Sequence, residues 1–203
     1  MVFTEEDIFK LQKIYRINLI NSCSGYKSAN LLGSISKDGS TNVAVFSSVT
    51  HLGSKPPTLG FILRPTTVPR NTYQNILDTG VFTINHIHKN IIEDAHHTSA
   101  KYDADISEFD QTNLFEEYKG EFEAPFVKGC PIQMAMSFVE EVYIASNDVK
   151  MIVGRIKELY IDDQLLQDDG FIDLSKGEVM SIIGLDGYAL PKLEERFGYQ
   201  RPK

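Results

Sequence analysis

Two long segments in the second half of the chain alternate between apolar and polar residues. The segment from Ile132 to Ile144 begins IQMAMSF, so its large apolar residues, Met134 and Met136 among them, occupy every second position. A period of two is typical of a half-buried β-strand. The segment from Val149 to Ile161 has the same length, and Ser146-Asn147-Asp148 between the two is typical of a hairpin turn. We therefore predict a long β-hairpin, with both methionines in the core.

Shorter strands are predicted before this hairpin. The segments from Leu31 to Ser36 and from Asn42 to Phe46 are joined by Lys37-Asp38-Gly39-Ser40, and Asp-Gly is a strong hairpin signal. Three more segments read as strands: Thr58 to Leu63, Val81 to Asn85, and Val179 to Ile183.

The predicted helices are short. Thr4 followed by three acidic residues indicates a helix start, and this helix is expected to end before Tyr15. A second helix is predicted from Asn71 to Leu77, capped by Asn71 or Thr72 and ending near Gly80. Further helical segments are expected at Lys89 to His97, within Asp103 to Glu117, and at Leu190 to Phe197. Many strands with few short helices favour a single domain over residues 1–203, mainly β with short helices and arranged as a barrel.

Composition excludes several kinds of partner. The formal net charge is -8, whereas proteins that bind nucleic acid need a basic face. No apolar run approaches the roughly 20 residues that cross a bilayer. The first residues, MVFTEEDIFK, lack the pattern of a signal peptide, which leads us to expect a cytoplasmic protein. A phosphate site in so acidic a chain must be local, built from a few arginines and backbone donors.

The cysteines and histidines give no metal signal. Cys23 and Cys130 lack the spacing of a metal pair and are interpreted as buried thiols rather than as a disulfide. His86 and His88 share a strand face if that strand continues, but no cysteine or carboxylate cluster completes a zinc set. We expect no metal site.

One stretch carries a family pattern. Asp38-Gly39 precedes Asn42-Val43-Ala44-Val45-Phe46-Ser47, after which come Pro56-Pro57, a strand to Arg64, Asn71-Thr72 with Asn75-Ile76, and Gly80 with Phe82 and Asn85. Gly184-Leu185-Asp186-Gly187-Tyr188 follows late in the chain. This pattern resembles the flavin reductase-like proteins, which are FMN-binding split β-barrels and include flavoredoxin-type members. The resemblance implies an FMN-binding split β-barrel that forms a homodimer with each flavin near the subunit interface.

The residues themselves suggest how a flavin would be held. Small side chains and backbone amides suit the edge of a flat ring, so we predict that the residues from Ala44 to Val49 line it: Ala44, Val45, Phe46, Ser47, Ser48 and Val49. Asn42, at the start of the same family pattern, is placed with them. The alternative is that Ser47-Ser48 simply ends a strand.

A phosphate clamp is predicted next to this segment. Arginine forks pair well with phosphate, and a helix start offers free amides. The predicted members are Arg64, Arg70, Asn71 and Thr72, with solvated arginines and an ordinary helix cap as the alternative. Asn85 is either a residue near the ring or a turn former. His96, His97, Thr98 and Ser99 either face the open side of the flavin or form a solvated helix end.

The predicted activity is oxidoreduction. The flavin ring carries the redox chemistry itself, so no catalytic side chain is assigned. We expect NAD(P)H-dependent flavin reduction, with transient NAD(P)H binding and hydride transfer to flavin N5. Two alternatives stay open: a non-catalytic FMN-binding electron carrier, sensor or flavin store, and a split-barrel oxidase related to the pyridoxamine-phosphate oxidases.

Overall fold

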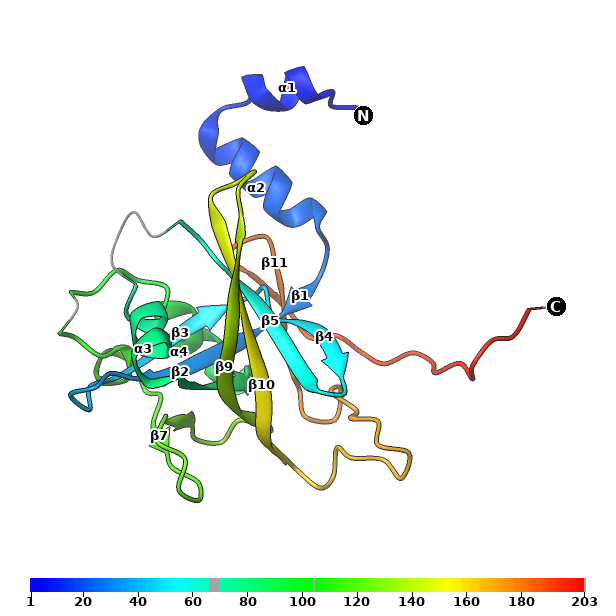
Figure 1. The fold of residues 1–203 in the computed structure, drawn as a ribbon. Helices are drawn as coiled ribbons and strands as arrows, with labels where there is room; N and C mark the ends of the chain where they lie inside the picture. The colour runs from blue at the N-terminus through cyan, green and yellow to red at the C-terminus, as the bar shows by residue number, and fades with distance from the viewer. Residues whose placement is uncertain (66–69, 104, 203) are drawn as a thin grey trace.

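The centre of the protein is a seven-stranded antiparallel sheet (Figure 1). The structure is a computed structural model that describes residues 1–65, 70–103 and 105–202. In order across the sheet, the strands are β3 (Thr41–Phe46), β2 (Asn30–Ile35), β6 (Val81–His86), β9 (Ile132–Ile144), β10 (Val149–Ile161), β5 (Pro57–Leu63) and β4 (Thr50–Ser54). The sheet twists strongly, with β9 and β10 running as a long ribbon through its middle (Figure 1).

The two longest strands have the predicted bounds. β9 and β10 pair from Ile144 opposite Val149 to Ile132 opposite Ile161, with a register shift at Val153/Gly154 and another further along. The predicted hairpin between β2 and β3 is confirmed as well. Strand β4 was not predicted; it pairs with β5 and forms the outer edge of the sheet.

Two hydrophobic clusters pack on opposite faces of the sheet. Neighbouring residues Leu31 and Leu32 point to different clusters, as the alternation of a strand requires. The cluster around Leu32 holds Met134 and Met136, which confirms that both methionines belong to the core. Each fully buried large apolar side chain of this kind stabilises the fold by roughly 1.5–3 kcal/mol.

Three aromatic rings organise that second cluster. Phe46 meets Phe61 with ring centroids 5.0 Å apart, and Phe61 meets Phe82 at 5.8 Å, both edge to face. Phe82 lies directly over Gly154, where an added Cβ would come within 2.6 Å of its ring. Glycine at this position therefore lets β10 pass under the ring of Phe82 beside the register shift.

Helix α3 (Asn71–Thr79) follows β5 and packs mainly on β2. It ends where predicted, because Gly80 adopts the left-handed conformation (φ 75°) that suits a helix C-cap. The predicted cap is wrong: Arg70 is the N-cap residue and makes no side-chain cap bond. The Thr72 hydroxyl instead bonds the side chain of Asn42 on β3.

Shorter elements complete the body. The predicted helical segment Lys89 to His97 is confirmed as η1 (Lys89–Ile91) and α4 (Ile92–His97), and Asp103 to Glu117 contains η2 (Glu108–Gln111). One small sheet joins β1 (Lys27–Ser28), β11 (Ser181–Ile183) and β12 (Gly187–Ala189), and another joins β7 (Glu116–Glu117) and β8 (Phe126–Val127).

The N-terminal segment is more helical than predicted. Helix α1 (Glu5–Lys10) begins with the predicted Thr4 cap, whose hydroxyl and backbone both bond Asp7. A second helix, α2 (Lys13–Cys23), covers the position where the sequence suggested an end. Neither helix contains a buried residue, so Cys23 is exposed and not buried as expected, whereas Cys130 is buried. Both cysteines are free thiols.

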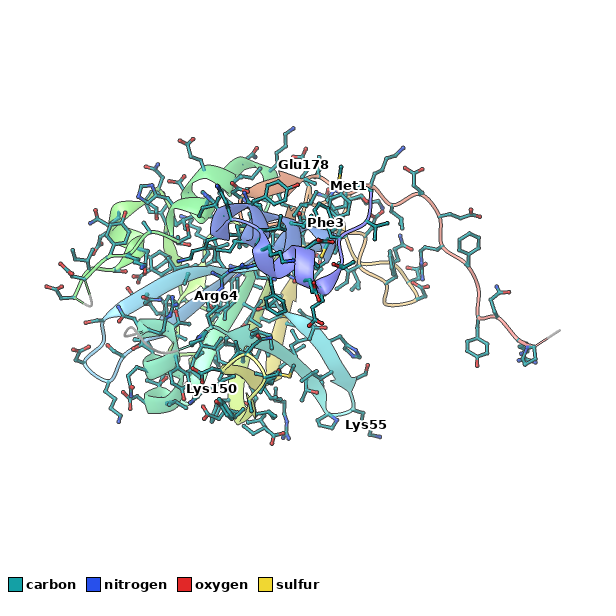
Figure 2. All side chains as sticks on the ribbon, turned by 90° about the horizontal axis from the view of Figure 1, so that it is seen from above. Met1, Phe3, Lys55, Arg64, Lys150 and Glu178 are labelled. Atoms are coloured by element: carbon teal, nitrogen blue, oxygen red, sulfur yellow. The ribbon has the colours of Figure 1, made fainter. Side chains whose placement is uncertain are left out.

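The C-terminal segment is not the predicted helix. Residues 190–202 run as an irregular, exposed chain that extends away from the body in both views (Figures 1 and 2). Pro191 removes a backbone donor at the start of this segment. The Arg196 side chain forms an ion pair with Asp169 and lies over the ring of Phe171, both of which belong to the body. None of the helices in the described ranges is long and apolar enough to cross a membrane.

Candidate functional site

A cleft of about 1300 Å³ lies between the seven-stranded sheet, the small sheet of β1, β11 and β12, and helices α2, α3 and α4. Its walls come from α2, β1, β3 with the connection to β4, β5, the start of α3, the end of α4 with the loop after it, η2, and β11 and β12 with the turn between them. Segments far apart in the sequence therefore share one site.

The cleft gathers most of the predicted cofactor residues. Eleven of the predicted positions line it: Asn42, Ala44, Val45, Phe46, Ser47, Ser48, Val49, Arg64, Arg70, Asn71 and Thr72. The predicted ring segment and the predicted phosphate residues thus share one cavity.

The connection between β3 and β4 is held rigidly. The Ser48 hydroxyl accepts a hydrogen bond from the Ile62 N–H at 3.0 Å and lies 3.2 Å from the Ile62 carbonyl. The carbonyl of Val49 accepts a bond from the Ser28 hydroxyl at 2.9 Å. Ser48 therefore does more than end a strand, because it ties the connection to β5 while small side chains leave the cleft open beside it.

Several basic side chains line the cleft although the protein is acidic, and the acidic Asp103, Glu108 and Asp186 line it as well. Arg64, Arg70 and Lys27 all line it. The pKa of Lys27 is lowered, first by burial and then by the nearby charge of Arg64. Within the described ranges, no carboxylate forms an ion pair with either arginine. In Figure 2, Arg64 lies near the middle of the view, whereas Lys55 marks the outer tip of the β4–β5 hairpin.

The start of α3 adds donors beside these basic side chains. Its first residues, Asn71 and Thr72, line the cleft, and Arg70 is the N-cap. The backbone N–H groups of a helix start have no partner within the helix and favour anions. Two guanidinium groups, an ammonium group and a helix start together suit a phosphate group.

A buried carboxyl group lies next to this phosphate-type part. Glu108 of η2 also lines the cleft and accepts a hydrogen bond from the Val43 N–H at 3.3 Å. Burial raises the pKa of Glu108, opposed by bonds from its own N–H and that of Val43. No sequence signal pointed to Glu108, because it lies 66 positions after Asn42 and reaches β3 only through the fold.

A histidine and a tyrosine form another wall. Nδ1 of His96 lies 3.3 Å from the Tyr188 hydroxyl, and the two rings meet edge to face. Burial raises the pKa of Tyr188 to about 12, so its hydroxyl stays protonated at neutral pH. Tyr188 belongs to the late glycine-rich segment of the family pattern, whose Leu185 and Asp186 line the cleft too.

Of the residues predicted at the end of α4 and just after it, some line the cleft and one does not. Thr98 and Ser99 line the cleft with His96. His97 does not line it; its ring stacks on Tyr102 and bonds the Tyr102 hydroxyl. Only part of this group therefore faces the site.

The turn interpretation of Asn85 is wrong, and the residue does not lie on the cleft wall. Its side chain is fully buried in β6, where it donates to the Leu31 carbonyl and accepts from the Val127 N–H. It does not line the cleft, and β6 continues through it to His86, so it forms no turn. Asn85 joins β2, β6 and β8 within the core.

Several cleft residues had no sequence signal at all. They come from the N-terminal segment: Ile20, Asn21, Ser24, Tyr26, Lys27 and Ser28. These residues reach the cleft because β1 pairs with β11 and because the Lys27 amine donates to the Gly184 carbonyl at 2.9 Å.

The remaining histidines have other surroundings. Burial lowers the pKa of His86 to about 4, and Nδ1 of His88 accepts the Asn90 N–H at the start of η1. In the part of the chain that the structure describes, no group of three or more histidine, cysteine or acidic side chains could hold a metal ion.

Comparison with known proteins identifies close likenesses. Residues 26–174 match the model of the flavin reductase like domain. A split-barrel protein of Shewanella frigidimarina, designated a flavin reductase, superposes with a TM-score of 0.95 at 44% identity. That similarity covers 98% of this chain and all of the Shewanella protein.

Two more distant structures share the fold. Flavoredoxin of Desulfovibrio vulgaris is 19% identical with a TM-score of 0.74, covering 86% of this chain and 91% of its own. An FMN-binding protein of Thermus thermophilus, solved with 1-cyclohex-2-enone, is 17% identical with a TM-score of 0.72 and coverages of 88% and 93%. The predicted split-barrel fold is confirmed.

Proposed function

Because the chain belongs to the flavin reductase-like family, we propose that it binds FMN in the cleft and acts as an NAD(P)H-dependent flavin reductase. The observation that carries this proposal is that one cavity contains both a place for a flat ring and a place for a phosphate group. A rigid connection with small side chains lies beside a group of basic side chains in a protein of net charge -8. A flat ring with an anionic tail needs both features together.

Each end of the cleft has its own task in this proposal. The residues from Ala44 to Val49 hold the edge of the ring through backbone amides. Arg64, Arg70 and the start of α3 hold the phosphate, which is why the site tolerates the overall acidity of the chain. The similarity to an FMN-binding protein of Thermus thermophilus supports FMN as the flavin.

The cleft also has room for a second molecule. Its volume of about 1300 Å³ exceeds the ~300–1,000 Å³ that is usual for a site of one small ligand. A bound flavin supplies hydride chemistry at N5, and the protein supplies binding and orientation. The wall formed by His96 and Tyr188 then borders the space for a transiently bound nicotinamide.

A titration with matched variants tests the cofactor. Purified protein is titrated with FMN and with riboflavin while flavin fluorescence is followed. Arg64→Ala is expected to weaken FMN binding about ten- to a hundred-fold, the effect of losing a charge-assisted hydrogen bond, and to change riboflavin binding little. Arg155→Ala removes an exposed arginine outside the cleft and should change neither affinity. A protein that binds no flavin at all would rule out the proposal.

The reductase activity needs its own assay. Absorbance at 340 nm is followed after NADH or NADPH is added to the protein with excess FMN. Turnover with loss of the flavin absorption band supports the reductase. Tight FMN binding without any nicotinamide oxidation would instead support the electron carrier.

We further propose that the protein is a homodimer. Helices α1 and α2 bury none of their residues, although Phe9, Ile14 and Tyr15 are apolar and exposed. The C-terminal segment likewise exposes Phe197 and Tyr199. Because the arms bury none of their residues within one chain, these apolar side chains are available to a partner copy. Since α2 also lines the cleft, a partner bound there would lie next to the flavin.

A further inference from the structure

A second, smaller cavity lies beside the cleft and is called the β11 cavity below. Strand β11 separates the two spaces, because Ser181 lines the cavity whereas the next residue, Ile182, lines the cleft, as the alternation of a strand requires. Ser28, directly opposite Ser181 in β1, borders both spaces. The β11 cavity therefore shares a wall with the cleft but is not part of it.

The β11 cavity is small and largely apolar. Its volume is about 160 Å³, and a cavity of ~150 Å³ can hold one benzene molecule. Five of the nine described residues that line it are apolar: Ala29, Leu174, Val179, Met180 and Pro191. Its size and lining therefore suit a guest with a single six-membered ring, and it is too small for the three fused rings of a flavin.

The start of the C-terminal arm forms one wall of this cavity. Pro191 lines it, and the Leu193 N–H donates to the hydroxyl oxygen of Ser175, another lining residue, at 2.7 Å. Three residues later, the Arg196 guanidinium pairs with Asp169 at 2.6 Å. The arm is thus attached to the body at two points beside the cavity, which gives the cavity a defined wall on that side.

His86 brings a polar group without a partner into the lining. Its side chain is half-buried, and its ring nitrogens make no hydrogen bond with the described residues. Burial lowers the pKa of His86 to about 4, so at neutral pH the ring is uncharged, with one nitrogen that donates and one that accepts. A hydroxyl group both donates and accepts, so it can bond either nitrogen.

The charges around the cavity restrict its guest further. None of the described residues that line it is charged at neutral pH, and a charge buried there without a partner would be costly. We propose that the β11 cavity binds a small uncharged molecule with one apolar ring and one hydroxyl group, and that this hydroxyl bonds the His86 ring. This site is independent of the proposed function, since it lies outside the cleft.

A titration with phenol tests the site. Phenol has one ring and one hydroxyl group and is uncharged at pH 7. It is added to the purified protein without flavin, and backbone amide and histidine ring signals are followed by nuclear magnetic resonance. We expect the signals of the His86 ring and of the Val179 and Ser181 amides to shift and to saturate in the millimolar range or below. Shifts that never saturate, or that leave these residues unmoved, would overturn the proposal.

Two controls test the location and the charge. The titration is repeated with excess FMN, which should leave the phenol affinity unchanged because the two spaces are separate. Competition with FMN, or shifts confined to His96 and Tyr188, would place phenol in the cleft and contradict the β11 site. Benzylamine has the same ring but is a cation at pH 7, so it should not shift the His86 signals. Saturable binding of benzylamine at His86 would also contradict the proposal.

Filling the cavity should prevent binding. Ser181 is half-buried and its direction is fixed by strand pairing, so Ser181→Leu places a larger apolar side chain in the cavity. Ser137 is also half-buried in a strand but lies outside both spaces, and Ser137→Leu is the matched control. We expect Ser181→Leu to abolish the saturable shift of His86 and Ser137→Leu to preserve it. Equal effects of the two substitutions would count against the site.

The role of His86 has its own test. His86→Phe keeps a ring but removes both nitrogens, and benzene is a guest without the hydroxyl group. The ratio of phenol affinity to benzene affinity should fall about three- to tenfold in this variant, the effect of losing one hydrogen bond. An unchanged ratio would overturn the proposal. If the variant does not fold, the unchanged protein decides: phenol should shift the His86 ring nitrogen signals more than benzene does, and equal shifts would contradict the hydrogen bond.

Discussion

The sheet body and the two chain ends differ in how they are stabilised. The body, residues 25–189, contains both hydrophobic clusters and every buried residue of the described chain. The two terminal arms, residues 1–24 and 190–202, contain no buried residue. The N-terminal arm is nevertheless helical, while the C-terminal arm is irregular (Figure 1).

This difference shows how the cleft is built. Its phosphate-type part and its ring segment belong to the body, where strand pairing and core packing fix them. Its remaining wall includes α2, which has only half-buried and exposed residues. The phosphate-type part and the ring segment are therefore fixed by the fold of one chain. The position of the wall formed by α2 depends on what packs against that helix.

The largest effect is expected from a cavity in the body. Phe82 is fully buried beside Phe61 and over Gly154, so Phe82→Ala leaves a void that rigid β-structure cannot fill. We expect a loss of about 3–5 kcal/mol in the free energy of unfolding, a large part of the ~5–15 kcal/mol usual for a folded domain. Urea denaturation followed by circular dichroism measures it.

The matched change in an arm should have little effect on the same measurement. Phe197 is 78% exposed, so Phe197→Ala removes the same ring without opening a cavity. At protein concentrations where the chain is monomeric, its unfolding midpoint should stay within experimental error of the unchanged protein. Equal destabilisation by the two substitutions would show that the arm packs on the body in solution.

The same contrast explains which elements the sequence predicted. β9 and β10 were predicted to the residue from the alternation of side chains at the start of β9 and from the turn between the strands, although β9 is buried on both faces at Ile132–Met136 and largely exposed beyond them. The end of α3 was predicted because Gly80 supplies a left-handed C-cap. In the arms no face is buried, so no periodicity distinguishes the helix at Lys13–Cys23 from the irregular residues 190–202.

The candidate site divides in a similar way. The ring segment and the phosphate residues are close in sequence, and a local motif was enough to predict them. Glu108 and Lys27 join the cleft through tertiary contacts with Val43 and Gly184, which no local pattern encodes. The structural role of Asn85 was not predicted, because a polar residue near a strand end can equally satisfy buried backbone groups, as it does with Leu31 and Val127.

A smaller effect is expected when the apolar residues of an arm are removed. If the arms dock on a second copy, the pair Phe197→Ala and Tyr199→Ala should raise the dimer dissociation constant about ten- to a hundred-fold, roughly 1.4–3 kcal/mol. Sedimentation velocity over a range of protein concentrations measures it. Phe115→Ala removes an exposed aromatic ring of the body and serves as control. A chain that is monomeric at all concentrations, or an equal effect of the control, would contradict the docking role.

The reactivity of the two cysteine thiols allows the arm and the body to be compared in the unchanged protein. The thiolate is the reactive form of cysteine, and access to it decides the rate. Cys23 in the arm is exposed, whereas Cys130 in the body is 7% exposed and burial raises its pKa to about 12. With an aromatic disulfide reagent at pH 8, we expect one thiol per chain to react quickly and the second only after urea is added.

Cys23→Ser should abolish the fast phase, and Cys130→Ser should leave it unchanged. A fast phase that survives Cys23→Ser would mean that the body opens around Cys130 as readily as the arm exposes Cys23, and the contrast between the two regions would be lost.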